Sequence, residues 1–412
     1  MMKKLLSLSL SVLMIALFTL TSCNREEKTY LGTITVKLNA NSEFPDVSVA
    51  DVEVSLTNTA DNIVRTEKTN AAGEAIFAQI PVGVYTVNTS VKITASLSLN
   101  GVAQNVVLAP NEIKVLPVNM EKAIGSDNFI IKEVFFAGKQ DYDQKDRFFE
   151  IFNNSDKVLY ADGLHFADLA GATGSDANDA VLGLPLDEYL YAMRVAKIPG
   201  NGSTYAVQPG KSIVIAFNAI NFKEGFNPGN WAGLKIEDYL DLSTADFEMN
   251  AIPFLESKGF TGNTWFDVDN PSVPDVEILY MFNAGNMTFF RLNDYGPGLV
   301  IFRPEQPLDV TNTILSPLST PNNPMYFLKI PVKYVIDGVD ILDNSSAAKF
   351  KRMDGKVDAG FTFLKADGKA FYSGMSIRRK VADVKSDRKV LMDTNNSTND
   401  FEAITRPTPR NY

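Results

Sequence analysis

Closely spaced carboxylates are the groups in this sequence that could do chemistry. The metal candidates are Asp141, Asp143 and Asp146 in one segment and Asp267 and Asp269 in another, where Asp275 and Glu277 follow. Such oxygens can surround a calcium ion, and two converging carboxylates can act as acid and base in glycoside hydrolysis. Neither segment has the glycine and distal glutamate of a complete EF-hand loop. We therefore favour solvated acidic loops, with structural calcium, the one cofactor these loops would suit, as the alternative.

Other common chemistries are excluded by residue counts. The chain has one histidine, His165, and one cysteine, Cys23, in 412 residues. A histidine-rich zinc site is thus ruled out, and a lone histidine on a predicted strand, such as His165, is more often a structural or surface residue than a catalytic base or a metal ligand. No phosphate loop or dinucleotide fingerprint occurs. The formal net charge of −10 and the lack of basic runs interleaved with aromatics exclude nucleic acid as a partner. We expect a protein that is not an enzyme, with a carboxylate-dependent hydrolase as the alternative.

Aromatic residues gather in residues 218–295, where glycine, asparagine and proline are interleaved with them. The candidates for ligand binding are Trp231, Tyr239, Trp265 and Phe266. Flat rings with polar residues between them would suit a sugar, haem or catecholate ligand. Buried aromatics also stabilise irregular segments, and we favour this core-filling role for most of these rings.

Cys23 indicates where the protein is located. It closes the run Leu20-Thr21-Ser22-Cys23 behind a basic start and an apolar stretch that is shorter than the roughly 20 residues of a spanning helix. This pattern resembles the lipobox of bacterial lipoproteins, in which a signal peptide, here residues 1–22, is removed and the cysteine is acylated. The resemblance implies that acyl chains on Cys23 hold the mature protein to a membrane.

Residues 23–30 form an acidic tether after the anchor. Glu26 and Glu27 resemble the signal that sends lipoproteins of Bacteroidetes to the outer face of the outer membrane. A solvated linker that happens to be charged is the alternative. The resemblance predicts a protein anchored in the outer membrane and facing the cell exterior.

Apolar and polar residues alternate with period two through residues 31–122, which predicts antiparallel strands. Asn100-Gly101 is a hairpin-turn signal within this region. Residues 52–56, 69–77 and 80–87 resemble the carboxypeptidase-regulatory-like, or prealbumin-like, β-sandwiches. That family implies a non-catalytic spacer that holds the rest of the chain away from the membrane.

Residues 128–412 resemble a lamin-tail-type immunoglobulin-like sandwich. The matching pieces are residues 129–136, 147–164, 209–217, 376–380, 393–402 and 407–409. They are spread too widely for one such sandwich, so an insertion at about residues 218–295, rich in loops and with short helices at 236–240 and 251–258, must intervene. The predicted fold is mainly β, with two antiparallel sandwiches. The basic run Arg378-Arg379-Lys380, with Lys385, Arg388 and Lys389 nearby, could contact lipopolysaccharide phosphates or an anionic partner, but we favour a polar edge strand that resists aggregation.

The order of these parts resembles a family of Bacteroidetes surface lipoproteins without an established activity. Our hypothesis is a non-enzymatic binding or accessory component of a TonB-dependent nutrient uptake system, with such a transporter as partner. A carboxylate-dependent surface hydrolase and a structural or adhesive envelope protein are the alternatives. The sequence leaves open the ligand, metal binding, the partner's identity and the oligomeric state.

Overall fold

The computed structural model describes residues 30–412 apart from 59, 61–62, 94–96, 125–127, 139–145, 172–180, 182, 225–234, 263–266, 283–288, 370–371 and 387. Several predicted features therefore lie outside the described residues: the signal peptide, Cys23, Glu26 and Glu27, together with Asp141, Asp143, Trp231, Trp265 and Phe266. The described residues form a mainly β protein with few short helices, as the period-two patterns predicted. No helix in them is long and apolar enough to cross a membrane.

The first domain packs a three-stranded sheet, β4-β1-β7, against a five-stranded sheet, β3-β2-β5-β6-β8. Its strands are β1 (Leu31–Asn39), β2 (Glu53–Asn58), β3 (Val64–Lys68), β4 (Glu74–Pro81), β5 (Gly83–Lys92), β6 (Leu97–Leu108), β7 (Ile113–Asn119) and β8 (Glu121–Ile124). Ile34, Val36 and Leu38 of β1 alternate with more exposed residues and enter the core between the sheets. The pairing is antiparallel except between β1 and β7, which run parallel.

Asn100 and Gly101 do not form the predicted hairpin turn. Both lie inside β6, opposite Ser90 and Thr89 of β5. The Asn100 side chain is buried, accepts a hydrogen bond from Ser90 Oγ at 2.7 Å, and donates to the carbonyl of Thr394 at 2.5 Å. The asparagine therefore serves the contact between the two domains, and this contact outweighs its local preference for a turn.

The second domain packs a six-stranded sheet, β16-β15-β10-β9-β22-β25, against a larger sheet, β19-β20-β13-β12-β18-β21, in which β17 also pairs with β13. Its strands are β9 (Phe129–Phe135), β10 (Phe148–Asn153), β11 (Leu159–Tyr160), β12 (His165–Leu169), β13 (Tyr189–Lys197), β14 (Ala206–Val207), β15 (Ser212–Ala216), β16 (Phe247–Glu248), β17 (Glu277–Met281), β18 (Gly298–Phe302), β19 (Thr313–Leu315), β20 (Tyr326–Pro331), β21 (Val335–Asp340), β22 (Ser376–Arg379), β23 (Val381–Lys385), β24 (Arg388–Leu391) and β25 (Phe401–Ile404). All residues of β9 and β10 are buried, because they occupy the centre of this domain.

Short helices occur in the connections of the second domain. They are η1 (Ile236–Asp238), α2 (Ile252–Ser257), η2 (Val310–Asn312), η3 (Val332–Tyr334), η4 (Ala347–Phe350) and α3 (Ser397–Asp400). Residues 218–295 contain η1, α2, β16 and β17, and the two strands pair with β15 and β13 respectively. This segment is therefore connected to both sheets of the domain.

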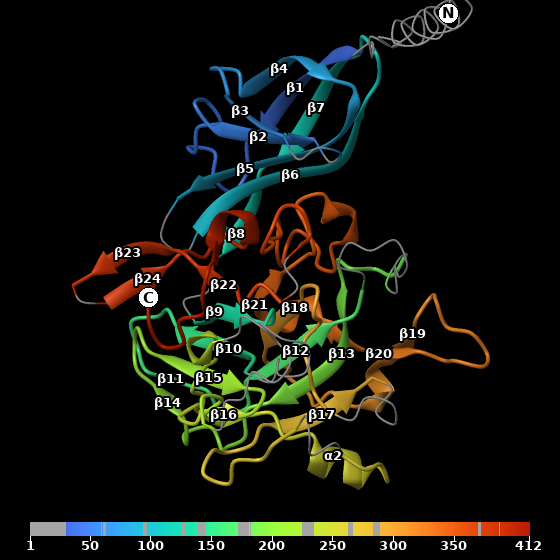
Figure 1. The fold of residues 1–412 in the computed structure, drawn as a ribbon. Coiled ribbons are helices and arrows are strands. Elements are labelled where there is room, and N and C mark those ends of the chain that lie inside the picture. Colours follow the sequence, from blue (N-terminus) through green and yellow to red (C-terminus); the bar gives the residue numbers. More distant parts are fainter. Residues whose placement is uncertain are drawn as a thin grey trace, which may run out of the picture.

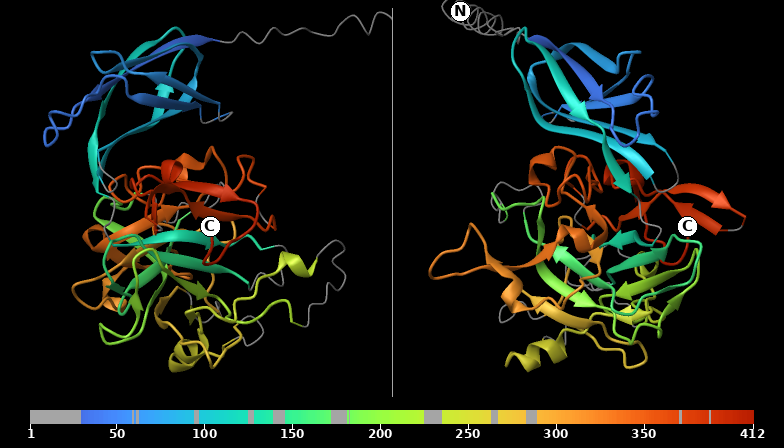
Figure 2. Two further views of the ribbon diagram at one scale, coloured as in Figure 1. Left: turned by 90° about the vertical axis from the view of Figure 1, so that its left-hand side faces the viewer. Right: turned by 180° about the vertical axis from the view of Figure 1, so that it is seen from behind.

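The two domains are stacked, and C-terminal segments of the second lie against the first (Figures 1 and 2). Hydrogen bonds between described residues cross this joint, such as those from Asn100 to the Thr394 carbonyl and from Asn396 to Asn88 Oδ1 at 3.1 Å. Thr394 and Asn396 precede α3, so this helix lies beside the joint.

The basic run at 378–380 is not an edge strand. Strand β22 lies between β9 and β25, and the Arg379 side chain is only 1% exposed. Its guanidinium forms ion pairs with Asp337 at 2.7 Å, Asp393 at 3.2 Å and Asp400 at 3.4 Å. Burial alone would lower the pKa of Arg379, but the three carboxylates raise it above its ordinary value. The cation therefore belongs to a buried charge network that joins the two sheets.

A buried aspartate organises the turn that precedes β14. The Asp162 carboxylate accepts hydrogen bonds from the backbone N–H groups of Asn201, Gly202, Thr204 and Tyr205, at 2.8 to 3.1 Å. Burial would raise the pKa of Asp162, but these donors hold it well below its usual range. Asp162 thus has a structural role in this turn.

Replacing Asp162 with alanine should lower the free energy of unfolding by about 2–4 kcal/mol, because four backbone donors lose their acceptor. Urea unfolding of the full chain measures the effect. Ser203→Ala is the matched control, since the exposed Ser203 bonds only to Asn201 in this turn. An equal loss in both variants would contradict the organising role of Asp162.

Candidate functional sites

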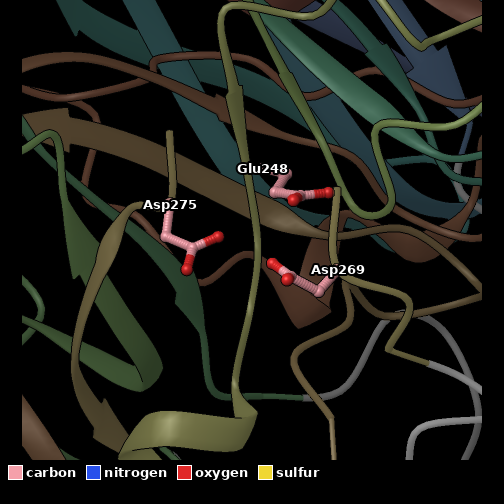
Figure 3. Close-up of side chains that lie close together, drawn as sticks. All are labelled: Glu248, Asp269 and Asp275. Carbon is pink, nitrogen blue, oxygen red and sulfur yellow. The ribbon is translucent and has the colours of Figure 1, made fainter. Parts of the chain in front are cut away.

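A carboxylate cluster lies at the end of β16. Side-chain oxygens of Glu248, Asp269 and Asp275 lie within 4.8 Å of one another and point toward a common centre (Figure 3). Glu248 is 1% exposed, and its two oxygens accept hydrogen bonds from the N–H groups of Ala219 at 2.9 Å and Asn270 at 2.6 Å. The cluster thus joins β16 to two loops that are distant from it in sequence.

Asp267 is a fourth, buried carboxylate beside this cluster. Its Oδ2 accepts a hydrogen bond from the N–H of Ala251 at 2.7 Å, at the start of α2. Burial, together with the charges of Glu248, Asp275 and Asp269, raises the pKa of Asp267 to about 7. Burial likewise raises the pKa of Glu248 to about 7, against its two backbone hydrogen bonds. Near neutral pH the carboxyl groups of Glu248 and Asp267 are therefore each protonated part of the time.

The cluster could hold a proton or a hard cation. Carboxylate oxygens are the ligands that calcium prefers, although three side chains supply fewer than its usual six to eight oxygens. Asn250 offers an internal alternative, because its amide donates to Asp269 at 3.1 Å and to Asp275 at 3.2 Å. The N–H of Ile252 donates to Asn250 Oδ1 at 3.2 Å, which fixes the orientation of this amide. The geometry thus already links two of the carboxylates without an ion.

The structure brings some of the sequence-selected carboxylates together and not others. Asp267, Asp269 and Asp275 converge, whereas Glu277 pairs with Lys197 at 2.8 Å on the surface of β17. Asp146 of the first candidate calcium segment is buried beside Arg147. The sequence analysis did not select Glu248 as a site residue. Its position between the apolar residues Phe247 and Met249 in a short strand is nevertheless a signal for a buried carboxylate.

The surroundings of Tyr239 and of His165 favour structural roles for both side chains. Tyr239 is buried, which leaves little of its ring for a ligand and favours the core-filling interpretation. His165 is partly buried, its Nδ1 lies 2.9 Å from the Gly163 carbonyl, and its ring packs against Phe302. Burial lowers the pKa of His165, so the imidazole is neutral at physiological pH.

A pocket of about 490 Å³ opens between the two domains. Strands β2 and β5 form one wall, and the segments around η4, residues 361–366 and α3 form the other. The described residues that line it are Glu53, Ser55, Thr57, Val64, Thr86, Asn88, Thr89, Ser90, Ser345, Ala348, Phe361, Phe363, Ala366, Thr398 and Asn399. Its volume lies in the range of pockets that hold small molecules, which often occur where domains meet.

A family comparison covers much of the second domain. Residues 208–408 match the family model described as "Protein of unknown function (DUF4876)". The chain contains a DUF4876 family domain. The matched residues run from just before β15 to just after β25, and they include the carboxylate cluster and one wall of the interdomain pocket.

A solved structure resembles most of the chain. A DUF4876 family protein from Bacteroides thetaiotaomicron VPI-5482, known from a crystal structure at 2.50 Å resolution, is 27% identical, and the match covers 92% of this chain and 97% of that one with a TM-score of 0.56. The TIE protein of Bacillus anthracis and a streptococcal ancillary pilin match 45% of this chain, over 28% and 53% of their own chains, at 15% and 13% identity, with TM-scores of 0.19 and 0.18. These low scores carry no argument. No curated protein matches the chain.

Proposed function

We propose that this chain is a lipid-anchored, cell-surface protein that binds a nutrient ligand without altering it, as an accessory to a TonB-dependent transporter of the outer membrane. The interdomain pocket is the observation that carries the proposal. Glu53 is the only ionisable carboxylate, amine or imidazole among the described residues that line it. A pocket with a single carboxylate lacks the acid–base pair that hydrolysis needs, but its hydroxyl, amide and aromatic groups suit binding.

The order of the chain supports a role outside the cell. The lipobox resemblance at Cys23 and the Glu26-Glu27 pair come first, and the first domain follows as a spacer. Because the pocket lies where this spacer meets the second domain, a ligand held there would stand clear of the membrane surface. The many loops of the second domain provide surface for a transporter contact.

The carboxylate cluster favours a second candidate, a carboxylate-dependent hydrolase. Burial raises the pKa of Glu248 to about 7, a value that suits a general acid or base, and the carboxylates of Asp269 and Asp275 lie beside it. Against this candidate, Glu248 is buried and both of its oxygens are engaged by backbone N–H groups. We therefore place the hydrolase second.

Replacing Cys23 with serine should move the protein from the membrane fraction to the soluble fraction, because the acyl acceptor is lost. Exchanging Glu26 and Glu27 for alanine should leave the protein acylated but protect it from protease added to intact cells. Asn24→Gln, which keeps the charge of the tether, is the control for both changes. Metabolic labelling with palmitate, fractionation and surface proteolysis provide the measurements.

Purification of the tagged wild-type protein from outer membranes should recover a TonB-dependent transporter. The Cys23→Ser protein, expressed at the same level, provides the background. Repeated recovery of the anchored protein without any transporter would remove the accessory role from the proposal.

A further inference from the structure

We infer that the interdomain pocket binds a neutral mono- or disaccharide, free or at the end of a longer glycan. This inference rests on the proposed binding function of the pocket, but not on the proposed transporter. It follows from three features of the pocket: one wall of small polar side chains, an opposite wall with two phenyl rings, and the near absence of charge.

The polar wall is a regular face of the first domain. Ser55 and Thr57 of β2 alternate with buried residues, so their side chains share the outer face of the sheet. In the register of β2 with β5, Ser55 lies opposite Asn88 and Thr57 lies opposite Thr86. Hydroxyl and amide groups therefore form a two-by-two array, with Ser90 continuing it along β5.

One hydroxyl of this array lacks a partner. Thr86 Oγ1 is buried, and no hydrogen-bond partner for it occurs among the described residues. A buried hydroxyl without a partner costs free energy, so a ligand that bonds to it gains from the contact. By contrast, Asn88 Oδ1 already accepts from Asn396 across the joint, which fixes the amide beside Thr86. The wall thus combines a fixed amide with a hydroxyl free to bond.

The opposite wall is aromatic and held in place. The rings of Phe361 and Phe363 lie 6.2 Å apart between centroids, with an interplanar angle of 47°. Thr398 Oγ1 of α3 donates to the Phe361 carbonyl at 2.8 Å and accepts from its N–H at 3.2 Å. Ala348 and Ala366 complete an apolar surface beside the rings. These contacts fix the position of an apolar platform that faces the polar array.

The charges and residue types of the lining exclude other nutrient classes. No lysine or arginine occurs among the described lining residues, so anionic ligands such as ferric catecholates find no counter-charge. No histidine, methionine, cysteine or tyrosine in that set could ligate haem iron. A sugar ring has an apolar face of C–H groups, which packs on phenyl rings, and an edge of hydroxyls, which bond to Ser, Thr and Asn side chains. It fits both walls and needs no charge.

Direct binding to the purified full-length protein tests the inference. The protein is kept in a non-glycosidic detergent, and glucose, galactose, mannose, maltose and cellobiose are screened by saturation-transfer NMR, with glucuronate as the anionic comparison. Binding of a neutral sugar is then measured by calorimetry. Thr86→Val, which preserves shape, should weaken that binding by about threefold to tenfold, because one hydrogen bond is lost. Phe363→Ala should weaken it by about tenfold or more, because the stacking surface is lost.

The matched controls are Thr66→Val on exposed β3 and Phe260→Ala after α2, neither of which lines the pocket. Both should bind as the wild type does. The inference is overturned by an absence of binding to every neutral sugar, by a preference for glucuronate, or by binding that Thr86→Val and Phe363→Ala leave unchanged. The sugar-binding assay contains no transporter. A failure to co-purify a transporter therefore does not change the result of the sugar-binding assay. Melting temperatures identify any variant that fails to fold, and the isosteric Thr86→Val then decides alone.

Discussion

The Arg379→Met variant should lose about 3–5 kcal/mol of unfolding free energy, the largest effect that we expect from a single substitution in this chain. Methionine keeps much of the volume of the arginine side chain but removes its charge. Asp337, Asp393 and Asp400, all buried, would then face one another without a cation. The bonds from Arg379 to the Ile131 and Met392 carbonyls would also be lost. Guanidinium chloride unfolding at neutral pH measures the difference.

The neighbouring residue provides the control. Arg378 is 17% exposed and pairs with the half-exposed Glu402 at 2.8 Å. Arg378→Met should cost no more than about 1 kcal/mol, as is usual for ion pairs near the surface. Adding Asp337→Asn to Arg379→Met should recover part of the loss, because one unpaired buried charge is removed. If Arg378→Met and Arg379→Met were equally stable, Arg379 would not hold the network together.

This pair of adjacent arginines shows where sequence reasoning ends. The run 378–380 reads as basic, and sequence alone predicts an exposed edge. The partners of Arg379 lie 42, 14 and 21 residues away along the chain, as the separations of its contacts with Asp337, Asp393 and Asp400 show. Asp337 lies on β21 of the opposite sheet, whereas Asp393 and Asp400 lie between β24 and β25, so the packing of the two sheets and the course of the chain after β24 bring them to the same side chain. Local patterns cannot report a network of this kind.

Local patterns performed best where a strand has one buried face. The alternation in β1 and β2 predicted their buried residues because a half-buried strand imposes period two on its own sequence. Local turn chemistry gave a wrong prediction at Asn100. The Asn100-Gly101 pair is typical of a hairpin turn, but the Asn100 side chain bonds to Thr394 of the other domain. Sequence reasoning likewise found Asp267 and Asp269, which lie close along the chain, and missed Glu248. It missed the interdomain pocket entirely, because each wall belongs to a different domain.

The second large effect concerns the pH dependence of stability. The folded-state pKa of Asp267 is about 7, above its ordinary value of 3.8, because the carboxylate is buried beside other acidic groups. Between these two pH values the folded protein keeps a proton that the unfolded chain releases, so the contribution of Asp267 is fully present below the lower value and is lost as pH rises through the higher one. This group alone should lower the unfolding free energy by about 2–3 kcal/mol between about pH 5 and about pH 8.

Asp267→Asn should remove this part of the pH dependence. The asparagine carbonyl can still accept from the Ala251 N–H, and its amide can donate to the neighbouring carboxylates, so the variant should match the wild type near pH 5 and exceed it by about 2 kcal/mol near pH 8. Asp156→Asn, an exposed aspartate outside the cluster, should leave the profile unchanged. An Asp267→Asn profile parallel to that of the wild type would contradict a protonated Asp267 in the folded state.

Adding calcium chloride near pH 8 tests whether these carboxylates bind a cation as well as protons. Glu248, Asp269 and Asp275 repel one another most when all are ionised, so an ion held among them would restore the stability that deprotonation removes. That gain would be lost in Asp269→Asn, which removes an exposed ligand and leaves Asp267 in place. An equal response of the wild type and Asp269→Asn to calcium would instead assign the pH dependence to protons alone, with Asn250 as the group that links Asp269 to Asp275.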